Sequence, residues 1–421
     1  KEIDTKEKSK MLDRPQQEAR ASARDDRSPK NVAEELAKKG FEVRQLLHFY
    51  MQKKISRDKS TAHVVRDIII PETAEHQTCY MESAFMKGHG GPQCAKKLVS
   101  HAWKSSFMNT VLNILLDASG LTVEDMKKKC MGYNGNLDAG KALQELSNDV
   151  LDKTYWLCIF AVNEHKSICG DCWHCKPQTP EEFRQERCSK CNCGSEDCCY
   201  GKERYNPCKC GSEKYKKGHP LYEIDKFDEV VGLMEGLVVS LDPELETLKR
   251  LWVVAEIGEA LKCKPIHFRH FFGLNEGIMN KLKTHKPVVP PVDLCEVTDP
   301  EDKRRILAKI DESEGGQNSF NLFVRCMVEV SFGVFSSLRD VSGDALKVFQ
   351  RMERLDINFG QVFSGTIVST SQVRIDWEKI KKIQHEKMDF SKCEELTDAS
   401  SMGQGLKEMK NLQHLVMIFS F

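Results

Sequence analysis

The sequence predicts an α/β protein built on a mostly parallel β-sheet. Two apolar runs, Thr154 to His165 and Gly236 to Leu241, have the continuous hydrophobicity of strands that are buried on both faces. Amphipathic helical patterns alternate with these runs, at Ser106 to Ala118 and again within Leu248 to Arg269, where a helix is followed by a short strand. This alternation of strands and helices is typical of a parallel sheet covered by helices on both faces.

The segment before the sheet is expected to be mostly helical. Residues 1–27 are charged and lack aromatic side chains, which predicts a disordered tail, and their lack of an apolar core argues against a secretory signal. Ser28-Pro29 opens a helical pattern that Gly40 interrupts and that continues to about Lys54. Val64 to Ile70 is β-branched and ends at a proline, which predicts a strand, and His76 to Gly91 is expected to be a loop. Residues 28–93 thus form an N-terminal helix and strand segment.

The remaining elements of the predicted α/β domain follow the same patterns. Gly120 ends the helix that begins at Ser106, as a C-terminal cap. The other expected elements are a strand at Lys97 to Ser100, a helix at Asp138 to Leu151, a strand at Tyr155 to Val162 and a helix at Glu223 to Met234.

A helical region without recognisable chemistry is expected after this domain, over residues 287–360. Pro287 to Pro291 reads as an extended linker. Thr298 and Glu301 have the spacing of a capping box and open a helix that runs to about Glu312. Phe320 to Leu338 and Ser342 to Arg354 are expected to be two further helices.

An internal repeat marks residues 361–421. Ile383-Gln384-His385 and Met388-x-Phe390-Ser391 recur 29 residues later as Leu412-Gln413-His414 and Met417-x-Phe419-Ser420. This period lies at the upper end of the range for leucine-rich repeats, so the segment is predicted to be the start of such an array, and repeats of this kind bind protein partners.

Composition narrows the classes of function. The 421 residues include 63 basic and 63 acidic side chains, and a formal net charge of zero makes a general nucleic-acid-binding surface unlikely. No apolar run is long enough for a transmembrane helix. Cysteines without a secretory signal favour a reducing compartment, so we expect a cytoplasmic protein.

Ten of the 18 cysteines fall in one short segment, within an insertion at residues 168–219. Cys169-x2-Cys172 and Cys188-x2-Cys191 have the spacing of a four-thiolate zinc site, and Cys175 is a competing ligand. A second site is expected from the remaining cysteines of the segment, Cys193, Cys198 or Cys199, Cys208 and Cys210, with His174 and His219 as spare ligands. The insertion has too few apolar residues to bury a core, so a structural zinc ion is predicted to fold it. An unliganded, redox-active thiol loop is the main alternative, and a zinc module that touches RNA is a weaker one.

Polar and aromatic residues gather where the predicted strands end. Ser100, His101 and Trp103 follow the first strand, and ligands of parallel sheets bind at the carboxyl ends of strands. Trp252 and Glu256 are four residues apart, which places both side chains on one face of a helix. Glu256 is surrounded by apolar neighbours, so it is either a functional acid or a core acid paired with a base, for example Lys249 or Arg250.

The order of these motifs resembles the Toll/interleukin-1 receptor (TIR) superfamily. A strand ending in SHAW, a strand ending in FAVNEH, a strand VVSLDP and a helix RLWVVAEI follow one another over residues 94–275. The resemblance is closest to a large group of protist TIR-like proteins, with features shared with fungal HET-type domains. It implies a flavodoxin-like sheet. In TIR NAD hydrolases the motif W-x-x-x-E-I-x-x-A-L carries the catalytic glutamate, and Glu256 falls on that position.

Two functions follow as hypotheses. In the first, the TIR-like domain hydrolyses NAD at the nicotinamide–ribose bond, with Glu256 as the catalytic carboxylate and with Trp252, Trp103, Ser100 and His101 lining the pocket. In the second, the domain is a non-enzymatic scaffold that self-associates while the repeats bind a protein ligand. An open pocket around Glu256 favours the enzyme, whereas a Glu256 engaged in a salt bridge favours the scaffold.

Overall fold

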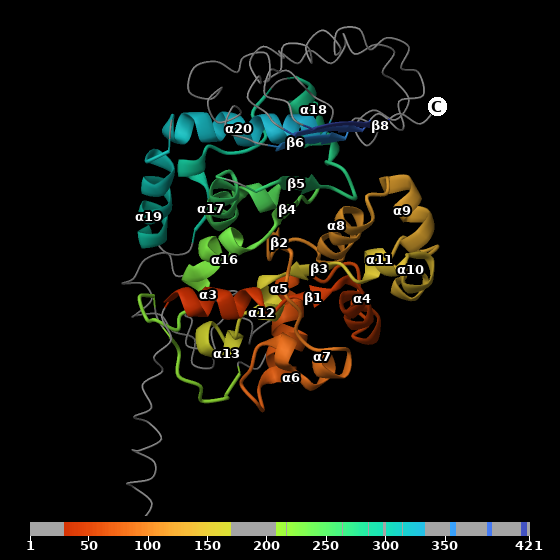
Figure 1. The fold of residues 1–421 in the computed structure, drawn as a ribbon, viewed down its shortest axis with the longest axis vertical. Coiled ribbons are helices and arrows are strands. Elements are labelled where there is room, and N and C mark those ends of the chain that lie inside the picture. Colours follow the sequence, from red (N-terminus) through yellow and green to blue (C-terminus); the bar gives the residue numbers. More distant parts are fainter. Residues whose placement is uncertain are drawn as a thin grey trace, which may run out of the picture.

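A computed structural model gives the fold of the chain (Figure 1). It describes residues 29–169 and 208–332, apart from positions 216, 263, 285, 298, 299 and 314, together with three strands near the C-terminus. The N-terminal tail and most of the Cys-rich insertion lie outside the described residues, as does all of the helix expected at Ser342 to Arg354 except Arg354 itself, which begins a strand.

The central sheet has five strands, which confirms the predicted α/β architecture. Three of its four pairs of neighbouring strands are parallel, so the sheet is mostly parallel as predicted. The strands lie in the order β1-β3-β2-β4-β5, and only β1 is antiparallel to its neighbour. Their bounds are β1 Phe41–Glu42, β2 Lys97–Ser100, β3 Thr154–Trp156, β4 Gly236–Ser240 and β5 Ile266–Arg269.

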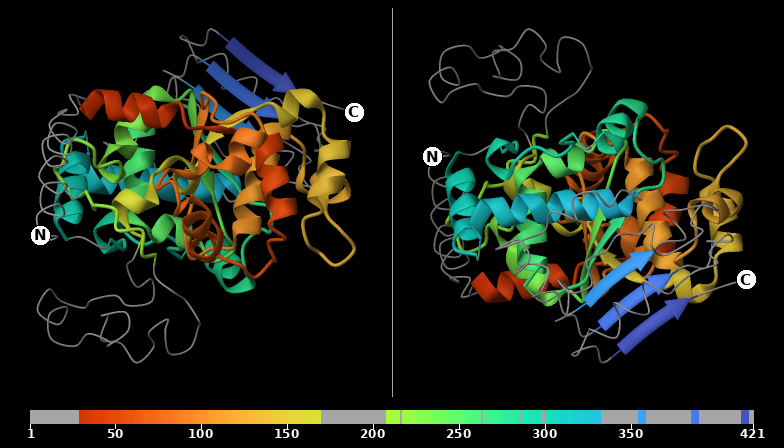
Figure 2. Two further views of the ribbon diagram at one scale, coloured as in Figure 1. Left: turned by 90° about the horizontal axis from the view of Figure 1, so that it is seen from below. Right: turned by 90° about the horizontal axis from the view of Figure 1, so that it is seen from above.

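Helices cover both faces of this sheet, and the side chains of the strands alternate between two hydrophobic clusters. Leu98 and Val239 belong to the cluster beneath α3, α16 and α17, whereas Val99 and Val238 belong to the cluster beneath α4 and α8. Figures 1 and 2 show these two groups of helices on opposite sides of the strands. The period of two in a strand therefore builds a separate core on each face. The bounds of these helices are α3 Pro29–Ala37, α4 Val43–Gln52, α8 Phe107–Ser119, α16 Phe227–Leu233 and α17 Leu251–Ala260.

Gly40 divides the first helical pattern as predicted, because the chain must pass very close to another segment. A Cβ atom at Gly40 would lie 2.6 Å from the Cβ of Ala95 and 2.9 Å from the carbonyl oxygen of Gln93. Gly40 and Gln93 instead pair through two backbone hydrogen bonds of 2.8 Å. The predicted C-terminal cap of α8 is also confirmed, since Gly120 has a left-handed conformation with φ of 66°.

One predicted strand is wrong, and another is shorter than predicted. Val64 to Ile70 is helical, in α5 Thr61–Val64, the π-helical turn Val65–Ile69 and α6 Ile70–Thr73, and its β-branched side chains are buried by packing on the α8 side. The strand predicted over Tyr155 to Val162 ends at Trp156, and α12 Cys158–Ala161 follows. A continuous apolar run marks burial but leaves the choice between strand and helix to tertiary packing.

Several helices differ from prediction in their bounds. The helix expected at Asp138 to Leu151 is interrupted and forms α10 Ala139–Glu145 and α11 Asn148–Leu151. The loop expected at His76 to Gly91 contains short helices. Other elements before β4 are the 3-10 turn Tyr80–Glu82, α7 Ala84–Gly88, α9 Val123–Cys130 and α13 Glu164–Ser167.

The helices that follow β5 pack against α17. Phe320 and Ile306 share one hydrophobic cluster with Ile257 and Val254 of α17, so the helical region adds to the core beside it. Its elements are α18 Glu276–Lys283, the 3-10 turn Val292–Leu294, α19 Pro300–Asp311 and α20 Gly316–Ser331. Among the residues that the structure describes, no helix is both long and apolar enough to cross a membrane.

A second, three-stranded parallel sheet is formed by β6 Arg354–Asn358, β7 His385–Asp389 and β8 His414–Ile418. β7 and β8 pair in register, with His385 opposite His414 and Asp389 opposite Ile418. This register has the same 29-residue offset as the sequence repeat.

Candidate functional site

Four potential metal ligands meet at the base of the Cys-rich insertion. His165 lies on α13, Cys169 follows that helix directly, and Cys208 and Cys210 lie where the described chain resumes. One ligand atom from each side chain falls within 4.8 Å of all the others. This cluster can hold a metal ion.

The spacing within the cluster matches a tetrahedral ion. The Sγ atoms of Cys169 and Cys210 are 3.6 Å apart, and Cys208 Sγ is 3.6 Å from His165 Nδ1. Zinc–sulfur bonds of about 2.3 Å and zinc–nitrogen bonds of about 2.0–2.1 Å give tetrahedral edges of roughly 3.5 to 3.8 Å. The two edges of 3.6 Å therefore match those of a zinc tetrahedron, and all four ligand atoms lie within 4.8 Å of one another.

A second layer of contacts prepares His165 as a ligand through Nδ1. The Thr73 hydroxyl donates to the carbonyl oxygen of Ile69 at 2.7 Å, so it accepts from Nε2–H of His165 at 2.9 Å. This bond assigns the proton to Nε2 and leaves the lone pair of Nδ1 facing Cys208. Burial, with the nearby Lys214 ammonium, lowers the pKa of His165 to about 4, so the ring is neutral at physiological pH.

Lys214 places a positive charge beside the cluster. Its Nζ donates to Cys169 Sγ at 2.6 Å and to the carbonyl oxygen of His165 at 2.8 Å. Burial raises the pKa of the Cys169 thiol to about 12, so this thiol keeps its proton near pH 7 unless a cation displaces it. Three thiolates around a divalent ion carry one net negative charge, which the Lys214 ammonium offsets.

The cluster differs from the predicted ligand sets. Cys169 was assigned to a first site and Cys208 and Cys210 to a second, but the fold brings all three together. His165 was not predicted as a ligand, although its position four residues before Cys169, at a helical turn, is a usable signal. The other predicted ligands, Cys172, Cys175, Cys188, Cys191, Cys193, Cys198 and Cys199, lie outside the described residues.

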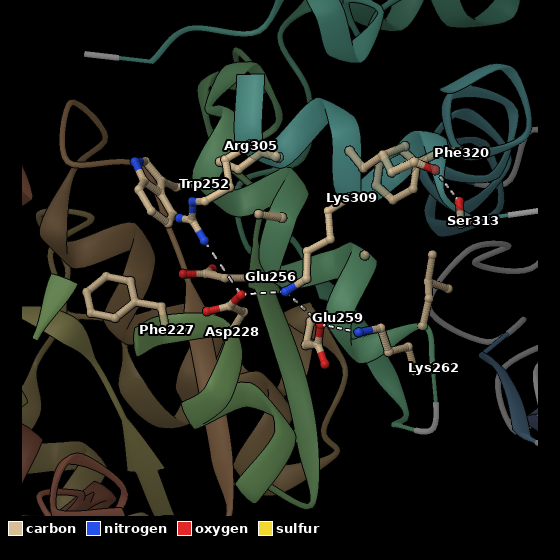
Figure 3. A pocket seen from close by; sticks show the side chains of 15 residues that line it. Phe227, Asp228, Trp252, Glu256, Glu259, Lys262, Arg305, Lys309, Ser313 and Phe320 are labelled. Atoms are coloured by element: carbon tan, nitrogen blue, oxygen red, sulfur yellow. Dashed lines mark hydrogen bonds and ion pairs between the residues drawn. The ribbon is translucent and has the colours of Figure 1, made fainter. Parts of the chain in front are cut away.

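A pocket of about 300 Å³ lies on the other side of the sheet, over α17 (Figure 3). Trp252 and Glu256 line it from α17, as their spacing predicts, and Phe227 lines it from α16. Arg305 and Lys309 of α19 form the opposite wall. The pocket therefore lies between the α/β core and the helices that follow it.

Glu256 is a buried acid in the wall of this pocket. It is 7% exposed, and its carboxylate accepts a hydrogen bond from the Ser100 hydroxyl. Burial raises the pKa of Glu256 to about 7; the Ser100 hydrogen bond opposes this shift and the charge of Asp228 adds to it. No ion pair of the described residues includes Glu256, and Lys249 pairs with Glu246 instead. The predicted partnership of Glu256 with Lys249 or Arg250 is therefore not found.

Ser100 places this acid at a point where ligands bind in parallel sheets. It is the last residue of β2, and the chain passes from β2 to β3 on one side and later to β4 on the other. A crevice opens at the carboxyl ends of two strands where the strand order reverses in this way. The contact between Ser100 and Glu256 thus links α17 to that edge of the sheet.

Of the other predicted pocket residues, Ser100 contacts Glu256 but does not line the pocket, and His101 and Trp103 lie elsewhere. His101 is buried, its Nδ1 is 3.4 Å from the carbonyl oxygen of Val99, and burial lowers its pKa to about 4. Trp103 packs against the hydrophobic cluster on the α8 side of the sheet. Neither lines the Glu256 pocket. The side chains of successive residues at the end of a strand point in different directions, so of these three residues only Ser100 contacts α17.

An ion-pair cluster on the α19 side of the pocket was missed by the sequence analysis. Lys309 Nζ is 2.6 Å from Asp228 Oδ2 and 3.5 Å from Glu259. Arg305 lies 4.0 Å from Asp228 and stacks over the Trp252 ring at 5.4 Å. The partners of each contact come from segments about 50 to 80 positions apart, so no local spacing indicates their contact.

Comparison with protein-family models, with curated proteins and with solved structures finds no match for this chain. The two sites are therefore interpreted from their chemistry. The first is a set of metal ligands with a preorganised histidine. The second is a pocket that combines a proton-exchanging carboxyl group, aromatic walls and a cluster of fixed charges.

Proposed function

We propose that the protein binds a structural zinc ion through His165, Cys169, Cys208 and Cys210. The observation that carries this proposal is the pair of 3.6 Å edges between their ligand atoms. Three thiolates and one imidazole fill all four tetrahedral positions, which leaves none for a reactive water molecule. Soft thiolate ligands favour zinc over magnesium or calcium.

The expected role of this ion is to close the insertion at its base. It would join the end of α13 to the returning chain at Cys208 and Cys210, and the Thr73 contact would tie this junction to α6. Because the insertion has few apolar residues, metal binding is the most direct source of its folding free energy.

Substitution of a single ligand tests the site. We expect wild-type protein to bind one more zinc ion per chain than Cys208→Ser, because a missing thiolate leaves an incomplete ligand set. Cys94→Ser is the matched control, since Cys94 is an exposed thiol outside the cluster. The measurement is metal content by mass spectrometry, together with the charge-transfer absorption of the cobalt-substituted protein. Equal metal content in wild type and Cys208→Ser would contradict the site.

We further propose, as a second function, hydrolysis of an N-ribosidic bond in the Glu256 pocket, with NAD as the first substrate to test. Three observations support it. Glu256, which falls on the glutamate of the resembled motif, lines a pocket; this acid contacts Ser100 at the end of β2; and the parallel strands β3-β2-β4-β5 have the order of a flavodoxin-like sheet.

The chemistry of the pocket fits this reaction. Cleavage of the bond between ribose C1′ and nicotinamide passes through an oxocarbenium-like state, which a carboxylate stabilises. Glu256 supplies a carboxyl group in a low-dielectric wall, and Trp252 and Phe227 supply flat apolar surface for a base. The pocket volume of about 300 Å³ is at the lower end of the usual range for ligand sites.

Glu256→Gln is expected to lower the rate of nicotinamide release by roughly 10²-fold or more, the usual range for loss of a positioned acid or base. Glutamine keeps the shape and the Ser100 contact but has no ionised form. The measurement is NAD turnover by metal-loaded protein with a crowding agent that permits assembly, and Glu244→Gln is the control because Glu244 is exposed.

The alternative to hydrolysis is a signalling scaffold. In this hypothesis the TIR-like domain self-associates, and the 29-residue repeats around β7 and β8 bind a protein partner. A folded, metal-loaded and assembled sample that releases no nicotinamide would exclude the NAD reaction and favour the scaffold.

A further inference from the structure

The Glu256 pocket contains a second carboxylate, supplied by a different helix. Asp228 lies in the first turn of α16 and lines the same pocket as Glu256. Figure 3 shows the two carboxyl groups close to each other, between the aromatic pair Phe227 and Trp252 and the Lys309 side chain. The charge of Asp228 also acts on Glu256, because it raises the pKa of that acid.

The two carboxyl groups have opposite environments. Asp228 holds an ion pair with Lys309 at 2.6 Å, and Arg305 lies 4.0 Å away. Glu256 contacts no cation among the described residues and receives only the Ser100 hydroxyl bond. Two neighbouring acids, of which one is paired with cations and the other is not, are suited to two different roles, one as a fixed anion and the other as a proton donor.

We propose that Glu256 and Asp228 act as a pair that cleaves neutral N-ribosides, the nucleosides whose base must accept a proton in order to leave. Glu256 is the proton donor and Asp228 is the anion that stabilises the ribosyl cation. The proposal rests on the hydrolase function of this pocket and extends its substrates beyond NAD, whose cationic nicotinamide leaves without a proton.

The bond between C1′ and the base nitrogen breaks, its electron pair stays with the base, and the proton of Glu256 neutralises the departing nitrogen. Positive charge develops on the ribose ring beside the Asp228 carboxylate. Water then adds to C1′ and returns one proton to Glu256, which restores the acid. The products are free ribose, or its phosphate, and the neutral base.

The pH dependence separates the two substrate classes. With a neutral riboside such as inosine, kcat requires the protonated form of Glu256 and is expected to fall as the pH rises through about 7. With NAD no proton is donated, and the ionised form of Glu256 accepts the proton of water, so kcat is expected to rise over the same range. A kcat that falls with pH for inosine and rises with pH for NAD would show that one group, Glu256, donates a proton to one substrate and accepts a proton in the reaction of the other.

Asp228→Asn tests the anion. We expect roughly 10²-fold lower kcat for inosine, because the substitution is nearly isosteric but removes the charge. Glu229→Gln is the matched control, since Glu229 is the next residue of α16 but is exposed and does not line the pocket. A merely structural role for Asp228 would give similar small losses in both variants and would overturn the proposal.

The interaction between Glu256 and Asp228 can also be tested without measuring catalysis, so that failure of the pair is distinguished from failure of the hydrolase function. Selective ¹³C labelling of glutamate allows the pKa of Glu256 to be followed by NMR, and Glu256→Gln assigns its signal. Asp228→Asn is expected to lower this pKa, because a neighbouring negative charge is removed while Lys309 and Arg305 remain. An unchanged pKa would mean that the two acids do not interact and would overturn the pair. NAD cleavage without inosine cleavage would overturn the pair and leave the proposed function intact.

Discussion

Removal of the metal from wild-type protein is expected to release the Cys-rich insertion and to lower stability more than any single change in the core. Zinc binding to structural sites is worth about 10–16 kcal/mol in small zinc-dependent peptides near pH 7. Here the ion would hold Cys169 and His165 to Cys208 and Cys210, and the insertion between them has few apolar side chains with which to fold alone. Part of this free energy should therefore appear as protection of the insertion from proteolysis.

The measurement is limited proteolysis and thermal unfolding before and after treatment with a chelator, followed by re-addition of zinc. We expect cleavage within residues 170–207 to accelerate at least tenfold on chelation and to return to its original rate with zinc. His165→Ala should behave like the chelated protein, while His219→Ala, which alters a histidine outside the cluster, should not. Cleavage that is insensitive to chelation would contradict a structural ion.

The same site gives a pH dependence with a defined sign. Burial raises the pKa of Cys169 to about 12, so metal binding must displace its proton, and metal affinity is expected to fall as the pH is lowered. The neutral form of His165, with its pKa lowered to about 4, competes for protons only in more acidic solution. Loss of the ion on acidification is therefore governed by the thiols.

Local sequence patterns were sufficient to predict those elements whose secondary structure is determined by residues within the same segment. β2, β4, α8 and the pair α17 and β5 lie where periodicity and caps predict them. The run after Tyr155 and the segment Val64 to Ile70 were predicted wrongly because both are apolar on several sides. In such segments the packing partners, which are distant in sequence, decide between strand and helix.

The candidate sites show the same division. The spacing of Trp252 and Glu256 is local, and the fold places both in one pocket. Asp228 reaches that pocket from another helix, and His165 meets Cys208 only after a long insertion closes. Sequence spacing identifies ligands that lie on one turn, whereas sites assembled from several segments depend on topology.

Asp117→Ala is expected to destabilise the fold by about 3–5 kcal/mol, because it removes the anion from a buried cluster of cations. The Asp117 carboxyl group is completely buried at the end of α8, where it accepts hydrogen bonds from four groups. These are Lys97 Nζ at 2.8 Å, the Tyr155 hydroxyl at 2.8 Å, His267 Nδ1 at 2.7 Å and Arg269 Nε at 3.2 Å. The cluster joins α8 to β2, β3 and β5, so its loss would loosen the packing of α8 on the sheet.

Acidification should reveal the same contribution. Although burial opposes ionisation, the hydrogen bond from His267 and the charges of Arg269, His267 and Lys97 hold the pKa of Asp117 well below its usual value. A depressed pKa stabilises the folded state at every pH above the unfolded value of about 3.9, and this stabilisation is lost as the pH falls towards the folded value. Urea unfolding of wild type and Asp117→Ala should therefore differ most near neutral pH and converge in strong acid. Asp293→Ala is the control because its side chain is exposed. A difference below about 1 kcal/mol at pH 7, the size of a typical surface pair, would show that the cluster contributes no more than such a pair.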